Sequence, residues 1–231
     1  MKTRIVIPAR LKSTRFPNKI LETLNKKTIL KTLLDRLKRS KIADKIIVAI
    51  PKNKRNLALK NYILSNKSIK IYEGSSQNVL SRYFGAAKKF SSEIIVRITS
   101  DCPLIDTEIL DKMILKFIEL KVDYLSNTLK PTFPDGYDIE IFNFETLKET
   151  FVNAKKLIDQ EHVTSYMKRN KKKFKLKNYF HKINLSNLRL TLDEKVDFEL
   201  ISNVTNVMKN KYFFSLNDVE ELYKKNPKLF N

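Results

Sequence analysis

Residues 45–50 read Lys-Ile-Ile-Val-Ala-Ile, and Pro51 follows them directly. A run of apolar residues without polar alternation is typical of a strand that is buried on both faces of a sheet. Residues 93–98, which read Glu-Ile-Ile-Val-Arg-Ile, have the same character, and shorter β-rich runs occupy residues 3–7 and 70–72. These segments predict four strands in the first half of the chain.

Segments with helical periodicity separate these strands. Apolar residues recur three and four positions apart from Ile29 to Leu37, which predicts a helix over residues 27–40. Similar spacing predicts helices over residues 55–64 and around residues 79–87. Buried strands that alternate with helices favour an α/β fold, in which a parallel sheet is covered by helices on both faces.

The second part of the chain has a less regular pattern. Apolar spacing around residues 109–117 predicts a helix, and short strands are expected near Tyr124 and over residues 139–142. Further helices are predicted over residues 144–155, 160–169, 196–208 and 217–225, and a further strand over residues 187–192. There is no internal repeat and no Gly/Ser-rich linker, so we expect residues 1–231 to form one domain.

The chain is strongly basic, with 46 Lys and Arg residues against 25 Asp and Glu residues and a net charge of +21. Six of these cations lie in residues 1–21 and nine in residues 162–192, and neither stretch contains an acid. Such density indicates a polyanionic partner: nucleic acid, nucleotide phosphates or an anionic membrane surface. For the lysine-rich residues 168–177, the alternative is a solvated surface without a specific partner.

Cysteine content and hydropathy exclude several classes of protein. The single cysteine excludes a disulfide framework and any multi-cysteine metal site. No apolar run approaches the ~18–20 residues that span a bilayer, and the N-terminal residues Met-Lys-Thr-Arg-Ile-Val-Ile are not a signal peptide. We therefore expect a soluble, cytoplasmic protein.

The loop after the first predicted strand concentrates positive charge. Residues 8–19 contain Arg10, Lys12, Arg15 and Lys19, with two hydroxyl side chains between them. Loops at the carboxyl ends of strands gather around ligands in open α/β sheets, and Arg, Lys and free backbone N–H groups bind phosphate. The first glycine is Gly74, so neither a G-x-G-x-x-G turn nor a Walker P-loop can follow this strand. Dehydrogenases and P-loop kinases are thereby excluded.

Two aspartates follow predicted strands. Asp101 comes after residues 93–98, and Asp193 follows the run Arg-Leu-Thr-Leu of residues 189–192. Magnesium commonly takes one or two carboxylates together with substrate phosphates, so this pair suits a metal site if the two strands are neighbours. The alternative is that each aspartate only forms a turn or caps a helix.

Several blocks along the chain resemble one known family. Residues 7–19, Ile-Pro-Ala-Arg-Leu-Lys-Ser-Thr-Arg-Phe-Pro-Asn-Lys, resemble the I-x-A-R-x-x-S-T-R-L-P-G-K signature of sugar-acid cytidylyltransferases. Residues 78–83 (N-V-L-S-R-Y), 96–106 (V-R-I-T-S-D-C-P-L-I-D), 133–140 (F-P-D-G-Y-D-I-E), 161–164 (E-H-V-T) and 189–198 (R-L-T-L-D-E-K-V-D-F) are similar to further blocks. Together they resemble most the branch of spore-coat polysaccharide biosynthesis protein F.

The resemblance implies a fold and a reaction. The fold is a GT-A-like nucleotidyltransferase fold, with a mixed, mostly parallel sheet. The reaction joins CTP to a sugar or sugar acid, gives a CMP-sugar and pyrophosphate, uses Mg²⁺ and serves surface polysaccharide or glycan biosynthesis. Residues 1–106 would be the CTP-binding half and residues 107–231 the acceptor-binding half. Relatives are often dimers, so a homodimer is expected.

The resemblance also assigns roles to individual residues. The catalytic residues would be Arg10, Lys19 and Asp101, and Asp101 would bind the metal together with Asp193. The residues that bind CTP would be Arg10, Ser13, Arg15 and Lys19 at the triphosphate, with Ser75, Asn78 and Arg82 by the cytosine. The residues that face the acceptor would be Arg97, Asp135, Tyr137, Glu140, His162 and Arg189.

The chain departs from the family at three glycines, which Lys12, Asn18 and Ser100 replace. Asn tolerates the left-handed backbone conformation that glycine supplies, so Asn18 is a mild change, whereas Lys12 is expected to strain the loop or to add a phosphate contact. For the acceptor proton, the metal itself and Asp138 are both candidates. Cys102 is interpreted as a packing residue, because no base is apparent for a catalytic thiol.

Other readings remain open at this point. The same fold also suits cytidylyl transfer to a phosphonate or alcohol, or a glycosyltransferase. A protein of a different class would be a nucleic-acid-binding module that uses residues 168–177, and it predicts steeply salt-dependent binding. No nucleic-acid motif or aromatic stacking ladder supports that reading.

Overall fold

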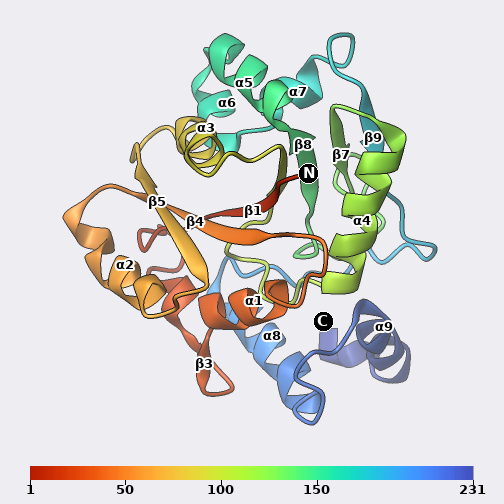
Figure 1. The fold of residues 1–231 in the computed structure, drawn as a ribbon. Coiled ribbons are helices and arrows are strands. Elements are labelled where there is room, and N and C mark those ends of the chain that lie inside the picture. The colour runs from red at the N-terminus through yellow and green to blue at the C-terminus, as the bar shows by residue number, and fades with distance from the viewer. Residues whose placement is uncertain (231) are drawn as a thin grey trace.

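The computed structural model describes residues 1–230, and a seven-stranded sheet forms its centre (Figure 1). The strands lie in the order β5 (Ile69–Gly74), β4 (Lys45–Pro51), β1 (Thr3–Pro8), β6 (Ile94–Arg97), β8 (Glu140–Asn143), β7 (Tyr124–Ser126) and β9 (Leu176–Asn178). β5, β4, β1 and β6 are parallel, β8 is antiparallel to β6 and β7, and β9 is parallel to β7. The expected mixed, mostly parallel sheet is confirmed.

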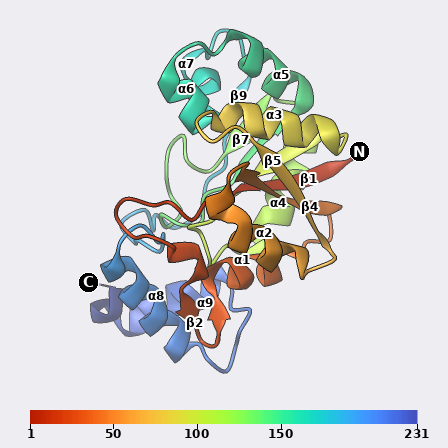
Figure 2. The same ribbon diagram turned by 90° about the vertical axis from the view of Figure 1, so that its left-hand side faces the viewer.

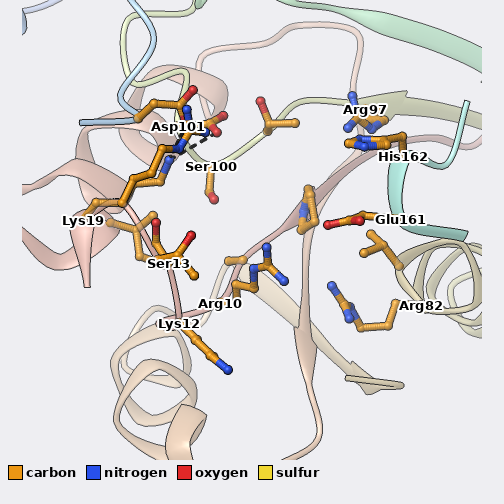
Figure 3. Close-up of a pocket in the computed structure, with 18 residues that line it drawn as sticks. Arg10, Lys12, Ser13, Lys19, Arg82, Arg97, Ser100, Asp101, Glu161 and His162 are labelled. Atoms are coloured by element: carbon orange, nitrogen blue, oxygen red, sulfur yellow. Dashed lines mark hydrogen bonds and ion pairs between the residues drawn. The ribbon is translucent and has the colours of Figure 1, made fainter. Parts of the chain in front are cut away.

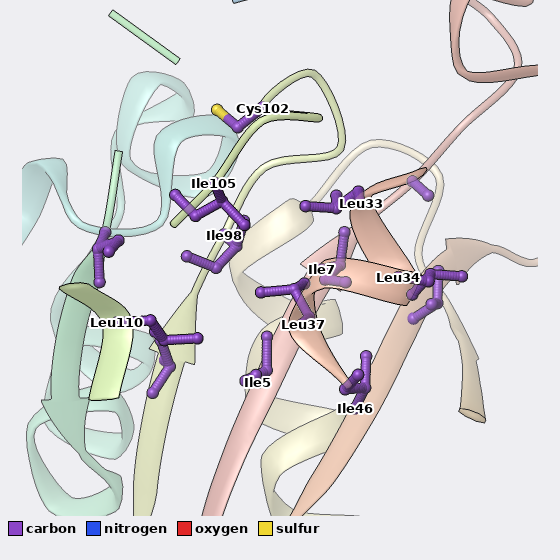
Figure 4. Packing of buried hydrophobic residues seen from close by; sticks show 14 of the residues in the cluster. Ile5, Ile7, Leu33, Leu34, Leu37, Ile46, Ile98, Cys102, Ile105 and Leu110 are labelled. Carbon is purple, nitrogen blue, oxygen red and sulfur yellow. The ribbon is translucent and has the colours of Figure 1, made fainter. Parts of the chain in front are cut away.

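Helices cover both faces of the sheet, because successive side chains of a strand point to opposite faces. Ile5 and Ile7 of β1 pack in one cluster with α1 (Ile29–Leu37), α2 (Leu57–Leu64) and α4 (Thr107–Leu120). Figure 4 shows Leu33 and Leu37 of α1 near Ile7 in this cluster.

The opposite face carries the other helices. Val6 of β1 packs there with residues of α3 (Val79–Lys89), α5 (Phe144–Asn153) and α7 (Ser165–Arg169). In Figure 2 these helices and α6 (Leu157–His162) gather on one side of the sheet, while α1 and α2 lie on the other.

A third hydrophobic cluster contains residues of the last two α-helices. It joins α8 (Lys195–Val207) and α9 (Leu216–Lys225) to Phe16, Ile29 and Leu104, and the one-turn helix η3 (Pro227–Phe230) packs against it. Leu188, Leu190 and Leu192 are buried in the same cluster. This packing brings the following residue, Asp193, into a cavity that also contains Pro8 and Thr99 from the carboxyl ends of β1 and β6.

The structure differs from the predicted elements at several points. Residues 187–192 form no strand, and only an isolated bridge joins Arg189 to Asp135, so their apolar pattern reflects packing in the third cluster. The helix predicted over residues 160–169 is interrupted at Val163, whose φ of 51° ends α6 before α7 begins. The helix predicted from residue 27 begins at Ile29, where the Thr28 hydroxyl accepts a hydrogen bond from the Lys31 N–H.

Some short elements were not predicted. They are β9, the two-stranded hairpin β2 (Thr23–Leu24) and β3 (Lys27–Thr28), and the one-turn helices η1 (Lys19–Leu21), η2 (Lys54–Asn56) and η3. No helix within residues 1–230 is both long and apolar enough to cross a membrane.

Part of the basic stretch has a structural explanation. Lys168 pairs with Glu140, Arg169 with Asp159, and Lys173 with Glu149. Lys175 and Lys177 are exposed on or beside β9, an outer strand of the sheet. Charged side chains, lysine above all, are typical of edge strands and discourage pairing with other chains, so the position of these lysines is consistent with a structural explanation.

Candidate active site

A cavity of about 340 Å³ opens at the carboxyl ends of β1 and β6 (Figure 3). Its wall includes most of the residues that the sequence singled out: Arg10, Ser13, Arg15, Lys19, Arg82, Arg97, Asp101, His162 and Asp193. In Figure 3, Lys19 and Asp101 lie at one side of the cavity, and Arg97, Glu161 and His162 lie at the other. Segments far apart in sequence therefore share one site.

The basic loop after β1 is held in place by backbone hydrogen bonds. The Leu11 N–H donates to the Asn56 side-chain oxygen over 3.1 Å, and the Asn18 N–H donates to the Leu11 carbonyl over 3.1 Å. Asn18 has a φ of 57°, which is the left-handed conformation expected where the family has glycine. Neither Lys12 in this loop nor Ser100 after β6 has a positive φ, so neither of these replacements is strained in the left-handed region.

Lys19 brings the two predicted metal ligands together. Its Nζ lies 3.0 Å from Asp193 Oδ1 and 3.5 Å from Asp101 Oδ2, and it donates to the Leu192 carbonyl over 2.5 Å. The Leu192 N–H in turn donates to the Asp101 carbonyl over 2.8 Å. The two aspartates are thus neighbours, as a shared metal site requires.

Asp193 is surrounded by positive charge. Arg15 Nη2 lies 3.1 Å from Asp193 Oδ1, and Arg189 Nη2 lies 3.4 Å from Oδ2. Partial burial opposes ionisation, but the hydrogen bond from Lys19 and these charges outweigh it and lower the pKa of Asp193. This carboxylate is therefore ionised at neutral pH.

Asp197 and Arg189 fix the segment that carries Asp193. Asp197 Oδ2 accepts from the Asp193 and Glu194 N–H groups over 2.7 and 2.8 Å. Arg189 donates to Asp197 and also lies 2.9 Å from Asp135. Arg189 thus holds Asp193, Asp135 holds Arg189, and neither Arg189 nor Asp135 belongs to the cavity wall.

Arg97 is anchored by a buried carboxylate. Glu140, whose side chain is only 2 % exposed, accepts hydrogen bonds from Arg97, Tyr124 and Thr164. Lys168 Nζ lies 2.8 Å from the same carboxylate. Burial opposes ionisation, yet the charges of Arg97 and Lys168 lower the pKa of Glu140 to about 2. Glu140 therefore acts on the cavity through Arg97, because it does not line the wall itself.

The backbone turn at Val163 presents His162 to the cavity. Val163 combines a φ of 51° with a ψ of −55°, and the Thr164 N–H donates to the His162 carbonyl across it. A positive φ is costly for a β-branched residue, but Val163 is fully buried and Thr164 is held by Glu140. The ring of His162 lines the cavity and makes no hydrogen bond within the described chain.

The residues expected near the cytosine are divided. Arg82 lines the cavity and donates to the Ser75 carbonyl, whereas Ser75 and Asn78 lie outside the wall. Asn78 caps α3 by accepting from the Ser81 N–H over 2.7 Å. Its position therefore has a structural explanation of its own.

Tyr137 was expected to face the acceptor, but its side chain is only 1 % exposed and belongs to the third cluster. It packs with Leu188 and Leu190 in that cluster and does not line the cavity wall. Cys102 is also buried, in the first cluster, which raises the pKa of its thiol and agrees with a packing role.

Sequence reasoning assigned no role to some residues of the wall, among them Thr14, Val79, Thr99, Ser100 and Glu161. All five lie inside the matched blocks, and all but Thr99 are directly beside an assigned residue. Adjacency to an assigned residue was the available signal for Thr14, Val79, Ser100 and Glu161.

The donor set fits a divalent cation held partly by a substrate. Within residues 1–230, no group of three or more His, Cys, Asp or Glu side chains forms a metal cage. Asp101 and Asp193 nevertheless converge on one cation, the Lys19 ammonium group. Two carboxylates plus substrate phosphates are a usual ligand set for Mg²⁺, so these residues fit such an ion.

Comparison with known proteins assigns the family. A model of the family described as cytidylyltransferase matches residues 4–230. The chain belongs to the cytidylyltransferase family. It is therefore a nucleotidyltransferase, and the resemblance seen in the sequence blocks is confirmed.

Individual relatives agree with this assignment. A solved cytidylyltransferase from Leptospira borgpetersenii serovar Hardjo-bovis is 34% identical, covers 100% of this chain and 97% of its own, and has a TM-score of 0.94. Spore coat polysaccharide biosynthesis protein SpsF of Bacillus subtilis is 27% identical over 229 residues, which are 96% of this chain and 94% of SpsF.

A more distant likeness concerns the fold alone. The structure of CMP:2-keto-3-deoxy-manno-octonic acid synthetase complexed with CTP has a TM-score of 0.66 at 13% identity, over 90% of this chain and 100% of that one. The expected nucleotidyltransferase fold is thereby confirmed.

Proposed function

We propose that this cytidylyltransferase transfers the CMP group of CTP to a hydroxyl of a sugar or sugar acid, releases pyrophosphate and serves the biosynthesis of a surface polysaccharide or glycan. The observation that carries the proposal is the single cavity in which the basic loop 8–19 meets Asp101 and Asp193. The relationship to a spore coat polysaccharide biosynthesis protein supports the biosynthetic role.

The basic loop suits a triphosphate. Arg10, Lys12, Arg15 and Lys19 all line the cavity, and the backbone between them is fixed. Guanidinium and ammonium groups stabilise the charge that builds on a departing pyrophosphate. Mg²⁺ held by Asp101 and Asp193 would supply further neutralisation at the phosphates.

The far side of the cavity suits the acceptor. Arg97, Glu161 and His162 gather there, opposite Lys19 and Asp101 (Figure 3). Arg97 and His162 can bind a carboxylate or hydroxyls, and Glu161 can accept from a hydroxyl. Because the buried Glu140 holds the Arg97 guanidinium in place, the far side of the cavity is preorganised before the acceptor binds.

In the proposed reaction, the acceptor oxygen forms a bond to the α-phosphorus of CTP as the bond to the pyrophosphate oxygen breaks. The hydroxyl proton passes to a base, for which we propose Asp138, a partly buried residue of the matched block 133–140 that is not itself part of the cavity wall. Burial and the charges of Asp135 and Glu140 raise the pKa of Asp138 to about 6, and Asp101 and Arg97 are among the charges that act on it. A carboxylate with this pKa can accept a proton near neutral pH.

A screen of pyrophosphate release tests the proposal. Each of CTP, UTP, ATP and GTP is incubated with Mg²⁺ and with a panel of neutral sugars, sugar acids, phosphonates and simple alcohols. We expect release with CTP together with a sugar or sugar acid. Release with a phosphonate or alcohol only would move the protein to the non-sugar alternative, and no CTP-dependent release with any acceptor would contradict the proposal.

Nucleic-acid binding is the proposal's rival from another class. It predicts tight binding to DNA or RNA that weakens steeply with salt. The basic stretch already has structural explanations that involve no nucleic acid. Lys168, Arg169 and Lys173 form ion pairs, and Lys175 and Lys177 lie at the edge of the sheet. A filter-binding titration at two salt concentrations distinguishes the two readings.

A further inference from the structure

Lys19 occupies a position that a divalent cation would need. Its ammonium group is in contact with three oxygens, Asp193 Oδ1 at 3.0 Å, Asp101 Oδ2 at 3.5 Å and the Leu192 carbonyl at 2.5 Å. The contacts with Asp193 and the Leu192 carbonyl are hydrogen bonds, and the contact with Asp101 is an ion pair. The side chain is only 13% exposed, so little of this cation faces water.

The geometry makes Lys19 and a metal ion competitors. Two carboxylates that share one cation repel each other when that cation leaves, so one positive charge has to stay between them. A divalent ion bound to both aspartates would need their carboxylate oxygens, and two cations a few ångströms apart repel each other. Lys19 and a divalent ion therefore compete for this pair of carboxylates.

Other anions can receive the lysine. Lys19 follows the left-handed Asn18 on a fixed loop, and its flexible side chain lines the same cavity as Arg10, Lys12 and Ser13. A triphosphate in that cavity would offer phosphate oxygens within the same space. The ammonium group could then exchange carboxylates for phosphates without loss of a charged partner.

We propose that Lys19 is a tethered cation that keeps the Asp101–Asp193 pair closed to divalent ions until a nucleoside triphosphate gives its ammonium group another partner. The inference rests on the proposed function for the identity of that partner. Nucleotide and divalent ion then favour each other's binding, because each removes an obstacle to the other. Without nucleotide, the pair binds metal weakly even though both of its carboxylates are in place.

The simpler reading is that Lys19 only pins the loop to the two aspartates. Both readings predict that its removal harms turnover, so activity cannot separate them. They differ in the metal affinity of the protein without nucleotide. A pinning residue supports the metal site, whereas a competing cation opposes it.

The test is to titrate the protein with Mn²⁺ in the absence of nucleotide. Electron paramagnetic resonance measures the free Mn²⁺ at each step and so gives the affinity. We expect Lys19→Met to bind Mn²⁺ at least about tenfold more tightly than the wild type, a factor that corresponds to about 1.4 kcal/mol. Lys12→Met is the matched control, because Lys12 lines the same cavity but forms no ion pair with either aspartate. Its Mn²⁺ affinity should change by less than about threefold, since it removes only a more distant charge.

Two further variants secure the interpretation. Lys19→Gln removes the charge but keeps a polar side chain, and its Mn²⁺ affinity should rise as well. It replaces Lys19→Met in the test if the methionine variant does not fold. In Lys19→Met/Asp193→Asn the gain should be lost, which assigns the bound Mn²⁺ to this pair. Equal or weaker binding in Lys19→Met and Lys19→Gln than in the wild type would overturn the proposal.

The titration contains no nucleotide and no acceptor, so its outcome is independent of which reaction the protein catalyses. If the screen for pyrophosphate release fails while Lys19→Met gains Mn²⁺ affinity, the proposed reaction is wrong, but the proposal that Lys19 competes with divalent ions is supported. If the screen succeeds while the affinity is unchanged, the function holds and Lys19 is a pinning residue.

Discussion

Glu140 lies beneath Arg97 and shares a buried ion pair with it, so a residue that does not touch the cavity determines how the cavity wall is arranged. The same carboxylate also binds Tyr124 of β7, Lys168 of α7 and Thr164, which precedes α7. One buried anion thereby connects the sheet, the Arg97 side of the cavity and the turn after His162.

Glu140→Gln should weaken both the fold and acceptor binding. The substitution leaves Arg97 and Lys168 without their counter-charge, and breaking a buried pair in this way costs about 3–5 kcal/mol of unfolding free energy. Denaturant unfolding measures that loss, and two-substrate kinetics should show a raised KM for the acceptor with a smaller change for CTP. Glu149→Gln, which only releases the surface residue Lys173, serves as the control and should leave both nearly unchanged. A Glu140→Gln variant with normal stability would show that the buried pair is not the anchor.

Stability should depend on pH through the same carboxylate. The pKa of Glu140 is lowered to about 2 because its charged neighbours outweigh burial. The stability that it contributes is therefore present above its unfolded pKa of about 4.3 and is lost as the pH falls from there toward 2. The stability difference between wild type and Glu140→Gln should shrink over that window in urea unfolding at a series of pH values. A difference that stays constant down to pH ~2.5 would show that the fold does not lower the pKa of Glu140.

Asp138→Asn should make the protein more stable but less active. The raised pKa of Asp138, about 6, means that its ionisation is harder in the fold than in the unfolded chain. Stability is consequently lost as the pH rises from about 4 to 6, and an asparagine avoids this loss. We expect a gain of about 1–2 kcal/mol in unfolding free energy at pH ~7.5, reduced from the full shift by partial exposure, and little gain at pH ~4.

The activity of Asp138→Asn gives the complementary result. If this carboxylate accepts the acceptor proton, kcat should fall by about a hundredfold or more, since general-base catalysis typically contributes that much. A variant that is more stable and fully active would assign the proton to a different group.

Asp101→Ala should abolish formation of the CMP product and leave the fold intact. Loss of a charge-stabilising group at the reacting phosphates typically lowers kcat by about a hundredfold or more. Circular dichroism checks the fold, and pyrophosphate release measures the turnover. Glu119→Ala, on the exposed face of α4, is a control for the removal of a carboxylate. Near-normal turnover of Asp101→Ala would show that Asp101 does not hold the metal.

Asn18 offers a test of the loop that carries the cations. Its φ of 57° suits Asn and Gly, so Asn18→Gly should keep the unfolding free energy within about 1 kcal/mol. Asn18→Val should lose about 1–2 kcal/mol, because a β-branched residue is strained in the left-handed region. Equal stability of the two variants in thermal or denaturant unfolding would mean that the loop adopts another conformation in solution.

Local pattern in the sequence was enough to predict the central strands and the position of Asp101, because buried strands leave long apolar runs. It did not predict the break at Val163, since buried packing and the Thr164–Glu140 contact hold a conformation that valine itself disfavours. The sequence pattern also missed β9, because Lys175 and Lys177 in and beside this strand obscure its apolar signal. It wrongly predicted a strand over residues 187–192, whose leucines pack in the third cluster. Contacts with distant segments decide each of these features.

In the candidate site, too, some features were predictable from the sequence and others depend on the fold. The cations of loop 8–19 and the two aspartates were identifiable from type and spacing, and the cavity brings them together. The burial of Tyr137 and Glu140 was not predictable, because a motif does not tell which of its side chains point into the core. Only the fold separates residues that form the wall from residues that hold it.

The central claim is the transfer of CMP to a hydroxyl, and phosphorus NMR of one reaction tests it most directly. The protein is incubated with CTP, Mg²⁺ and the acceptor that responds in the screen. The account predicts that CTP is replaced by equal amounts of pyrophosphate and of a single phosphodiester that joins CMP to the acceptor. Formation of CDP with a phosphorylated acceptor, or of CMP without an acceptor ester, would contradict it.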